Sequence, residues 1–79
     1  MATLKLYTSN NCPFCERVKS FIKTEGIENV ELVNISEDAE EREYLIEHGG
    51  MMQVPCLFID DKPMYESADI INYLKELKQ

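Results

Sequence analysis

The sequence lacks any long apolar run, and this absence limits the kinds of protein it can encode. No stretch approaches the roughly 18 apolar residues that a membrane-spanning helix needs. The first segment, MATLKLYTSN, has neither the basic start nor the apolar core of a signal peptide. Glycine and proline are scarce, with three of each among 79 residues, and 44% of the residues are hydrophobic. This composition excludes disordered and fibrous chains, so we expect one globular domain over residues 1–79 in the cytoplasm.

Basic residues and cysteines are also few. Eight lysines and arginines stand against fifteen acids, which gives a net charge of -7. A charge of this sign repels phosphate backbones and anionic lipid headgroups, so we expect no nucleic-acid partner and no membrane partner. The three cysteines, Cys12, Cys15 and Cys56, are too few and too odd in number for a disulfide framework. In a reducing compartment, a close pair such as Cys12 and Cys15 more often does chemistry or binds a metal.

The apolar pattern predicts an α/β fold with the element order β-α-β-α-β-β-α. This order implies a four-stranded mixed sheet flanked by three helices. The expected elements are a strand over 4–8, a helix from Pro13 to Gly26, a strand over 30–35, a helix capped by Ser36 and ending at Gly49, a strand over 56–59, a turn over 60–63, a strand starting at Met64 and Tyr65, and a helix capped by Ser67.

Two finer expectations concern burial. Residues 30–35 are apolar on both faces, which favours an interior parallel strand covered by helices on each side. Each helix also carries an apolar stripe at helical spacing that is expected to face the core. The stripes are Phe14, Val18, Phe21 and Ile22 in the first helix, Leu45 and Ile46 in the second, and Ile70, Ile71, Leu74 and Leu77 in the last.

The segment CPFC, residues 12–15, begins the first helix and carries the two close cysteines. Proline suits the first helical position, because its missing N–H has no partner there, and this places Cys12 at the N-cap. Unpaired backbone N–H groups and the positive end of the helix dipole then favour a thiolate at Cys12 over a thiol. Cys15 lies one turn further along the same face, less exposed. We therefore expect Cys12 to attack disulfides and Cys15 to resolve the mixed disulfide.

Other interpretations of these residues remain open. A zinc site would need Cys12, Cys15, Cys56 and the single histidine, His48, to converge as four ligands. An inert, buried cysteine pair is the other alternative. His48 is expected in the last turn of the second helix, where a cation suits the dipole, and not as a catalytic base. Cys56 is either a buried strand residue or an accessory redox group.

Three segments together resemble the glutaredoxin family, and the similarity runs over essentially the whole chain. They are KLYT leading into CPFC, then QVPCLFID, and YESADI at the start of the last helix. The resemblance implies a thioredoxin-like fold and a thiol–disulfide oxidoreductase. Such a protein reduces protein disulfides or glutathione mixed disulfides, with Cys12, Pro13 and Cys15 as catalytic residues. It also implies glutathione as cosubstrate, no tightly bound cofactor or metal, and a monomer. YESADI is similar to glutathione transferase N-terminal domains as well.

The same resemblance implies a glutathione site. Pro55 would follow a cis peptide bond and Val54 would pair with the cysteinyl residue of glutathione through its backbone. Ser67 and Ala68 would bind the γ-glutamyl carboxylate, and Glu66 or Asp69 the ammonium group. For Ser67 and Asp69, plain helix capping is the alternative. The implied set is Gln53, Val54, Pro55, Glu66, Ser67, Ala68 and Asp69.

The sequence departs from the family pattern at several of these positions. Phe14 replaces the usual tyrosine, Gln53 the usual threonine, and Tyr65 with Glu66 the usual glycine pair. Ser9 stands where many members carry a lysine. Loss of that cation weakens thiolate stabilisation and capture of an anionic tripeptide, so we expect low glutathione affinity.

Three further residues have two interpretations each. Arg42 either replaces the missing lysine or pairs with a neighbouring acid, and we favour the second interpretation. Met51 and Met52 either border the active-site groove or fill gaps in the core.

Two alternatives for the function of the whole protein also stay open. The first is a redoxin recharged by a flavoenzyme reductase. The second is a dimer that holds an iron–sulfur cluster with Cys12 of each chain and two glutathiones.

Overall fold

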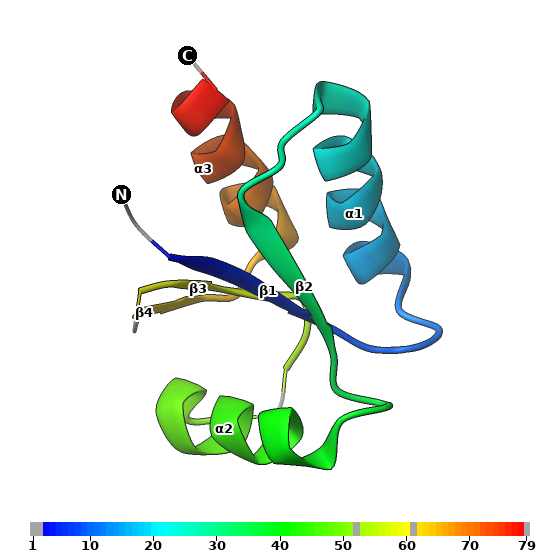
Figure 1. Cartoon of the computed structure of the whole chain (residues 1–79), viewed down its shortest axis with the longest axis vertical. Coiled ribbons are helices and arrows are strands. Elements are labelled where there is room, and N and C mark those ends of the chain that lie inside the picture. Colours follow the sequence, from blue (N-terminus) through cyan, green and yellow to red (C-terminus); the bar gives the residue numbers. More distant parts are fainter. Residues whose placement is uncertain (1–2, 52, 61, 79) are drawn as a thin grey trace.

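The structure, a computed structural model, describes residues 3–51, 53–60 and 62–78 and has the predicted order of elements. In chain order these are β1 (Leu4–Thr8), α1 (Pro13–Glu25), β2 (Val30–Asn34), α2 (Ala39–Gly49), β3 (Cys56–Ile59), β4 (Lys62–Met64) and α3 (Ser67–Lys78). Helices α1 and α3 cover one face of the sheet and α2 covers the other (Figure 1). No helix within the described ranges is long and apolar enough to cross a lipid bilayer.

The sheet is mixed, and its strand order is β2-β1-β3-β4. Strand β1 runs parallel to β2 and antiparallel to β3, and β3 and β4 form an antiparallel pair. The parallel direction of β2 was predicted correctly, but its interior position was wrong, because β2 lies at one edge and its Leu32 is 53% exposed. Apolar residues on both faces of a strand indicate that helices lie over both faces of the sheet, and they carry no information about the edges of the strand.

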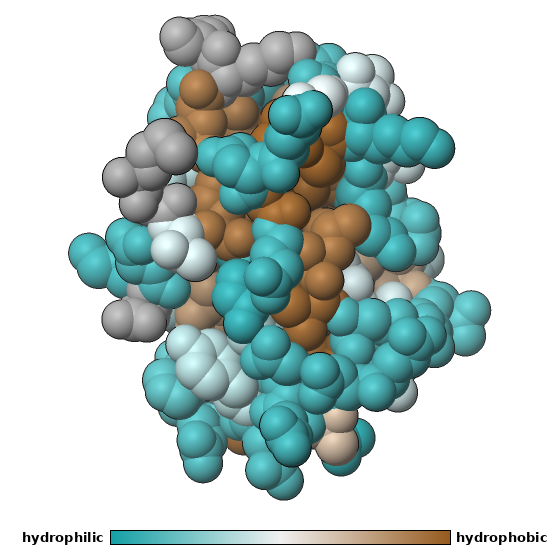
Figure 2. Space-filling view, viewed as in Figure 1, coloured by the Kyte–Doolittle hydropathy of each residue, from teal (hydrophilic) through white to brown (hydrophobic). Residues whose placement is uncertain are grey.

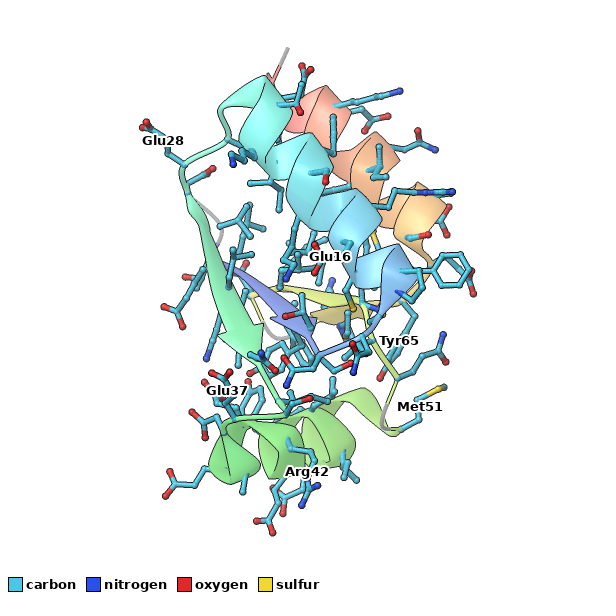
Figure 3. All side chains as sticks on the ribbon, turned by 90° about the vertical axis from the view of Figure 1, so that its right-hand side faces the viewer. Glu16, Glu28, Glu37, Arg42, Met51 and Tyr65 are labelled. Atoms are coloured by element: carbon cyan, nitrogen blue, oxygen red, sulfur yellow. The ribbon has the colours of Figure 1, made fainter. Side chains whose placement is uncertain are left out.

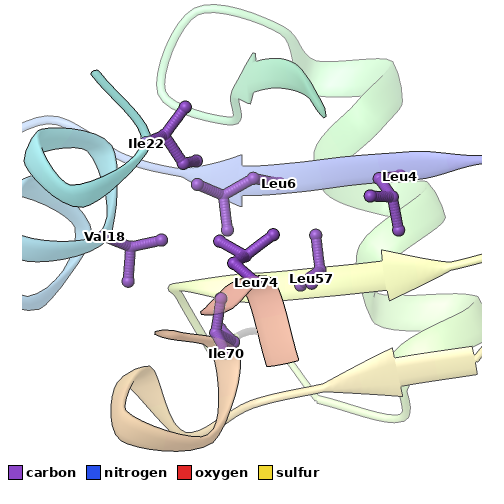
Figure 4. Close-up of a cluster of buried hydrophobic side chains, with 7 residues drawn as sticks. All are labelled: Leu4, Leu6, Val18, Ile22, Leu57, Ile70 and Leu74. Carbon is purple, nitrogen blue, oxygen red and sulfur yellow. The ribbon is translucent and has the colours of Figure 1, made fainter. Parts of the chain in front are cut away.

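The core consists of two clusters, one on each face of the sheet. Strand β1 contributes to both, since Leu4 and Leu6 point towards α1 and α3 while Tyr7 points towards α2. The first cluster, shown in Figure 4, is Leu4, Leu6, Val18, Ile22, Leu57, Ile70 and Leu74. The second is Tyr7, Val33, Ile35, Leu45, Cys56 and Phe58. Each fully buried side chain of this size contributes about 1.5–3 kcal/mol through removal from water.

Three residues of the predicted stripes are not in this core. Phe14, Ile46 and Leu77 are 56%, 43% and 48% exposed. Phe14 and Leu77 lie in the first turn of α1 and the last turn of α3, and Ile46 is rotated about 100° around α2 from the buried Leu45. Two others, Phe21 and Ile71, are half-buried.

The start of α2 also differs from the prediction. Its N-cap is Asp38, whose carboxylate accepts a hydrogen bond from the Glu41 N–H at 3.2 Å. Ser36 does not cap it, because its hydroxyl oxygen accepts from the Asn10 N–H at 3.1 Å. A turn closed by the Glu37 N–H and the Asn34 carbonyl, 3.1 Å apart, occupies the intervening residues and delays the helix.

Helix α2 is fixed to the sheet by a polar and aromatic contact set. The Glu41 carboxylate accepts hydrogen bonds from Lys5 Nζ at 2.9 Å and from the Tyr7 hydroxyl at 3.1 Å. Burial and the Glu41 contact raise the pKa of Tyr7 to about 12, so the hydroxyl stays a donor at neutral pH. The Tyr44 ring stacks on the Tyr7 ring with centroids 6.1 Å apart. These contacts hold α2, and the residues that follow it, at a defined place under the sheet.

The hairpin and the last helix begin at slightly different residues than predicted. Lys62 and Pro63 belong to β4 and not to the turn, while Tyr65 follows the strand. Proline is tolerated there because β4 is an edge strand. Asp61 of the predicted turn and Met52 lie outside the described residues. Ser67 is the first residue of α3 and not its cap, because the first helical bond runs from the Ile70 N–H to the Glu66 carbonyl at 2.9 Å.

Candidate active site

Cys12 occupies the N-cap of α1, as predicted, with Pro13 at the first helical position. Its backbone is extended, with φ -112° and ψ 104°, and its carbonyl accepts the first helical bond from the Glu16 N–H at 3.0 Å. The Cys12 Sγ accepts a hydrogen bond from the Cys15 N–H at 3.2 Å. The sulfur thus sits at the start of α1, where the unpaired backbone N–H groups of a helix gather.

Cys15 has a different environment from Cys12, although it lies only three residues away. Its side chain is fully buried, whereas that of Cys12 is half-exposed. Burial, together with the hydrogen bond to Cys12, raises the pKa of the Cys15 thiol to about 12. Cys15 is therefore a protonated thiol at neutral pH, and the expected asymmetry between an exposed and a protected sulfur is present.

A second segment, which is distant from Cys12 in the sequence, also lies beside the Cys12 sulfur. The peptide bond between Val54 and Pro55 is cis, as the resemblance implied, and Pro55 is buried. The Val54 carbonyl oxygen lies 4.0 Å from Cys12 Sγ. Residues that are 42 positions apart in the sequence therefore meet at one sulfur.

A groove of about 150 Å³ runs beside this contact. It brings together five of the seven residues of the expected glutathione set, namely Gln53, Val54, Pro55, Glu66 and Ser67, and adds Phe14 and Tyr65. The remaining two, Ala68 and Asp69, are exposed in the first turn of α3 and do not line the groove. Figure 3 shows Tyr65 and Met51 on the side of the molecule where α1 begins.

A second groove, of about 200 Å³, is also lined by Val54 and contains Arg42. Its lining residues are Ser9, Ile35, Ser36, Arg42 and Val54. The favoured interpretation of Arg42 as an ion-pair partner is wrong, because no carboxylate within the described ranges lies within 4.0 Å of its guanidinium. Val54 therefore lines two grooves, one beside the start of α3 and one beside Arg42.

Several residues of these grooves were missed from the sequence. The apolar pattern assigns Tyr65 to a strand, and Ile35 and Ser36 to a strand end and a helix cap. Tyr65 enters the resemblance only as a departure from the usual glycine pair. Tyr65 directly precedes Glu66 of the expected glutathione set, and this adjacency is the signal that could have indicated it. Ile35 and Ser36 are far from that set along the chain, so no such signal exists for them. Met51, for which two interpretations were open, is 49% exposed and does not fill a gap in the core.

The other cysteine and the histidine lie in structural surroundings. Cys56 is fully buried in β3, as predicted, and burial raises the pKa of its thiol to about 11. His48 lies in the last turn of α2, where its ring stacks on that of Tyr44 with centroids 3.9 Å apart. Within residues 3–51, 53–60 and 62–78, no three histidine, cysteine or acidic side chains form a group that could hold a metal ion.

Comparison with known proteins gives a consistent assignment. The glutaredoxin family model matches residues 4–64. Glutaredoxin 3 of Escherichia coli (strain K12) is 38% identical over 60 residues, which span 76% of this chain and 71% of that protein. Among solved structures, a thioredoxin-like protein gives a TM-score of 0.77 at 27% identity over 94% of this chain and 97% of the other. A wheat glutaredoxin gives 0.70 at 26% identity, covering 94% and 72%. The chain belongs to the glutaredoxin family of thiol–disulfide oxidoreductases.

Proposed function

We propose that this protein reduces glutathione mixed disulfides and protein disulfides by exchange at Cys12, with glutathione as cosubstrate. The observation that carries the proposal is the position of Cys12 Sγ. This sulfur is half-exposed, accepts the Cys15 N–H at 3.2 Å and lies 4.0 Å from the Val54 carbonyl. It is both accessible to a disulfide and next to a backbone that can hold an extended thiol peptide.

The chemistry proceeds by two exchanges. The Cys12 thiolate attacks one sulfur of the substrate disulfide, a new S–S bond forms, and the other substrate sulfur leaves as a thiolate. For a mixed disulfide, a second glutathione then attacks the glutathionyl sulfur and releases Cys12 with formation of glutathione disulfide. For a protein disulfide, the Cys15 sulfur attacks Cys12 Sγ, the Cys12–Cys15 bond forms, and the bond from Cys12 to the substrate breaks, so that the second substrate sulfur leaves and takes up the proton that Cys15 loses. Two glutathiones then return the oxidised pair to two thiols and become glutathione disulfide.

The two grooves support a binding mode for glutathione. The Val54 backbone would pair with the cysteinyl residue, and the N–H groups of Ser67 and Ala68 at the start of α3 would bind the γ-glutamyl carboxylate. Glu66 or Asp69 would take the ammonium group. We assign the glycine carboxylate to Arg42, because this unpaired cation lines the second groove that Val54 lines.

A reducing, cytoplasmic setting and a monomeric state complete the proposal. The three cysteines are free thiols, and the proposed cycle consumes reduced glutathione, which requires a reducing compartment. Every group that the cycle uses comes from one chain of residues 1–79, acting as one domain, and no tightly bound cofactor takes part.

The test is turnover of a glutathionylated substrate in the presence of glutathione and glutathione reductase, with thioredoxin reductase as the alternative electron source. We expect Cys12→Ser to abolish turnover, because no other exposed thiol can attack. Cys15→Ser should retain removal of glutathione from mixed disulfides and lose reduction of protein disulfides. Turnover with thioredoxin reductase alone would instead favour a redoxin recharged by a flavoenzyme. Equal activity in both variants and the unaltered protein would contradict the assignment.

A further inference from the structure

The outer edge of β2 is a free strand edge. Strand β2 ends the sheet, and within the described ranges only β1 pairs with it. The Ile35 N–H donates to the Thr8 carbonyl at 2.8 Å, so Ile35 points its backbone groups towards β1. Because backbone groups alternate along a strand, those of Glu31 and Val33 also face β1, whereas those of Leu32 face outwards. The Leu32 N–H and carbonyl are therefore open to another strand.

The two edges of the sheet differ in how they are protected. Edge strands usually carry lysine or proline or are very short, which prevents pairing with other chains. Strand β4, at the opposite edge, has all three features, with Lys62 and Pro63 in three residues. Strand β2 has five residues, VELVN, and neither lysine nor proline. The β4 edge of the sheet is thus protected from pairing with another chain, whereas the β2 edge is not.

The face of β2 towards α1 and α3 is apolar and partly uncovered. Val30 and Leu32 pair in register with Leu4 and Leu6, which belong to the cluster under α1 and α3, so their side chains point to that side. Leu32 is nevertheless 53% exposed, and Val30 is half-buried. Figure 2 shows apolar surface along the middle of the face on which β2 lies nearest the viewer. A neighbouring strand would cover this surface.

The opposite face of the same strand is acidic. A groove of about 430 Å³ runs along β2 on the side of α2. Its charged residues are Glu31, Glu37, Asp38 and Glu41. Lys5 reaches two of them, Glu41 at 2.9 Å and Glu31 at 3.8 Å, and leaves a net negative charge in the groove. Figure 3 shows Glu37 beside the carboxyl end of β2, at the turn into α2.

We infer that the outer edge of β2 binds an extended segment of a partner protein, added antiparallel to β2, in which basic and apolar residues alternate. Side chains of an added strand alternate between the same two faces, so apolar residues would cover Val30 and Leu32 while basic residues would meet the acidic groove. The antiparallel direction is favoured because its hydrogen bonds are more stable per residue.

A second copy of this chain does not fit the same edge. Two β2 strands placed edge to edge would bring both acidic grooves together, with Glu31 and Glu37 of each chain on one side of the joint sheet. Like charges that face each other across strands are destabilising, and each chain already carries a net charge of -7. A basic partner strand removes this repulsion.

The test uses a short fluorescent peptide in which lysine and valine alternate, and measures binding to the whole protein by fluorescence anisotropy. In the antiparallel arrangement, the valine residues lie opposite Leu32 and direct their N–H groups to β2. N-methylation of the valine amides should therefore abolish binding, whereas N-methylation of the lysine amides should leave it nearly unchanged. A peptide of the same composition with valines and lysines in separate blocks should bind roughly tenfold more weakly, because only alternation satisfies both faces.

Protein variants localise the site. Glu37→Lys and Leu32→Gln should each weaken binding roughly fivefold, because one reverses a charge of the groove and the other removes the apolar contact. The matched controls are Glu43→Lys, an exposed acid of α2 outside the groove, and Leu77→Gln, an exposed leucine of α3. Both should bind the peptide as the unaltered protein does. Amide exchange of the Leu32 N–H should slow when the peptide is bound.

Three results would overturn the inference. The first is no binding of the alternating peptide tighter than about 1 mM. The second is binding that survives methylation of the valine amides. The third is self-association of the protein, seen by sedimentation, that disappears in Leu32→Gln, since it would make a second copy the occupant. None of these measurements depends on redox activity, so they stand apart from the test of the proposed function.

Discussion

At the scale of single residues, the sulfurs of Cys12 and Cys15 differ because their surroundings differ. Cys12 is half-exposed at the helix cap, whereas burial raises the pKa of Cys15 to about 12 and that of Cys56 to about 11. Only thiolates react quickly with alkylating reagents. Iodoacetamide at about pH 7 should therefore modify Cys12 alone in the folded protein. Mass spectrometry after digestion identifies the modified residue. As a control, denaturant should make all three cysteines react. Labelling of Cys15 in the folded protein would contradict the difference between the two sulfurs.

Arg42 is the residue whose role changed most between sequence and structure. As an unpaired cation beside Val54, it should bind a substrate carboxylate, so Arg42→Gln should raise the KM for glutathione roughly tenfold with little change in kcat. Steady-state kinetics at low ionic strength measure this split. Arg17→Gln is the control, because Arg17 is an exposed arginine of α1 that lines neither groove beside Val54. An equal KM in Arg42→Gln and the unaltered protein would remove Arg42 from the site.

At the scale of elements, the contact between the end of α2 and Tyr65 positions the groove. The Tyr65 hydroxyl donates a hydrogen bond to the Gly49 carbonyl, and a side-chain carbon on Gly49 would overlap that hydroxyl oxygen. Replacement of a helical glycine by alanine normally stabilises a helix by about 1 kcal/mol. Here we expect Gly49→Ala to destabilise the protein by about 1–3 kcal/mol, because overpacking outweighs propensity.

Urea denaturation of four proteins measures this contact. They are the unaltered chain, Gly49→Ala, Tyr65→Phe and the double variant. Removal of the hydroxyl should relieve the overlap, so the double variant should be more stable than the sum of the two single changes predicts. Additive effects would show that Gly49 and Tyr65 are not in contact.

The sequence predicts the type of each element well. It predicts poorly which elements and residues lie next to each other in the fold. Helical spacing and the CPFC segment were enough to place α1 and its cap, because both depend on residues close in the chain. The edge position of β2 and the meeting of Arg42 with Val54 depend on how separate elements pack. Ser36 does not cap α2 for a related reason. Its hydroxyl oxygen accepts a hydrogen bond from the N–H of Asn10, 26 residues away, and Asp38 is the N-cap instead.

At the scale of the whole molecule, three buried acidic groups link stability to alkaline pH. The pKa values of Cys15 and Tyr7 are raised to about 12 and that of Cys56 to about 11, from ordinary values of 9.0, 10.0 and 9.0. The folded chain therefore holds these protons at pH values where the unfolded chain has lost them. The free energy of unfolding should be insensitive to these groups below pH 9.0 and should fall as the pH rises towards about 12.

Urea midpoints measured across this pH range test the linkage. Cys56→Ala removes one of the three groups, so its stability should decline less steeply between pH 9.0 and about 11. A stability that stays level up to pH 11 in the unaltered protein would contradict the burial of these protons.

Because the core is divided into two clusters, substitutions in one cluster should affect Cys12 and substitutions in the other should affect Val54. Helix α1, which carries Cys12, packs into the cluster on one face of the sheet, whereas Val54 packs against the cluster on the other. Substitutions in the cluster under α2 should thus shift the Val54 backbone and leave the amide groups around Cys12 intact, while substitutions in the cluster under α3 should do the reverse. Under the proposed function, substrate affinity at Val54 and reactivity at Cys12 can therefore change separately in a chain of only 79 residues.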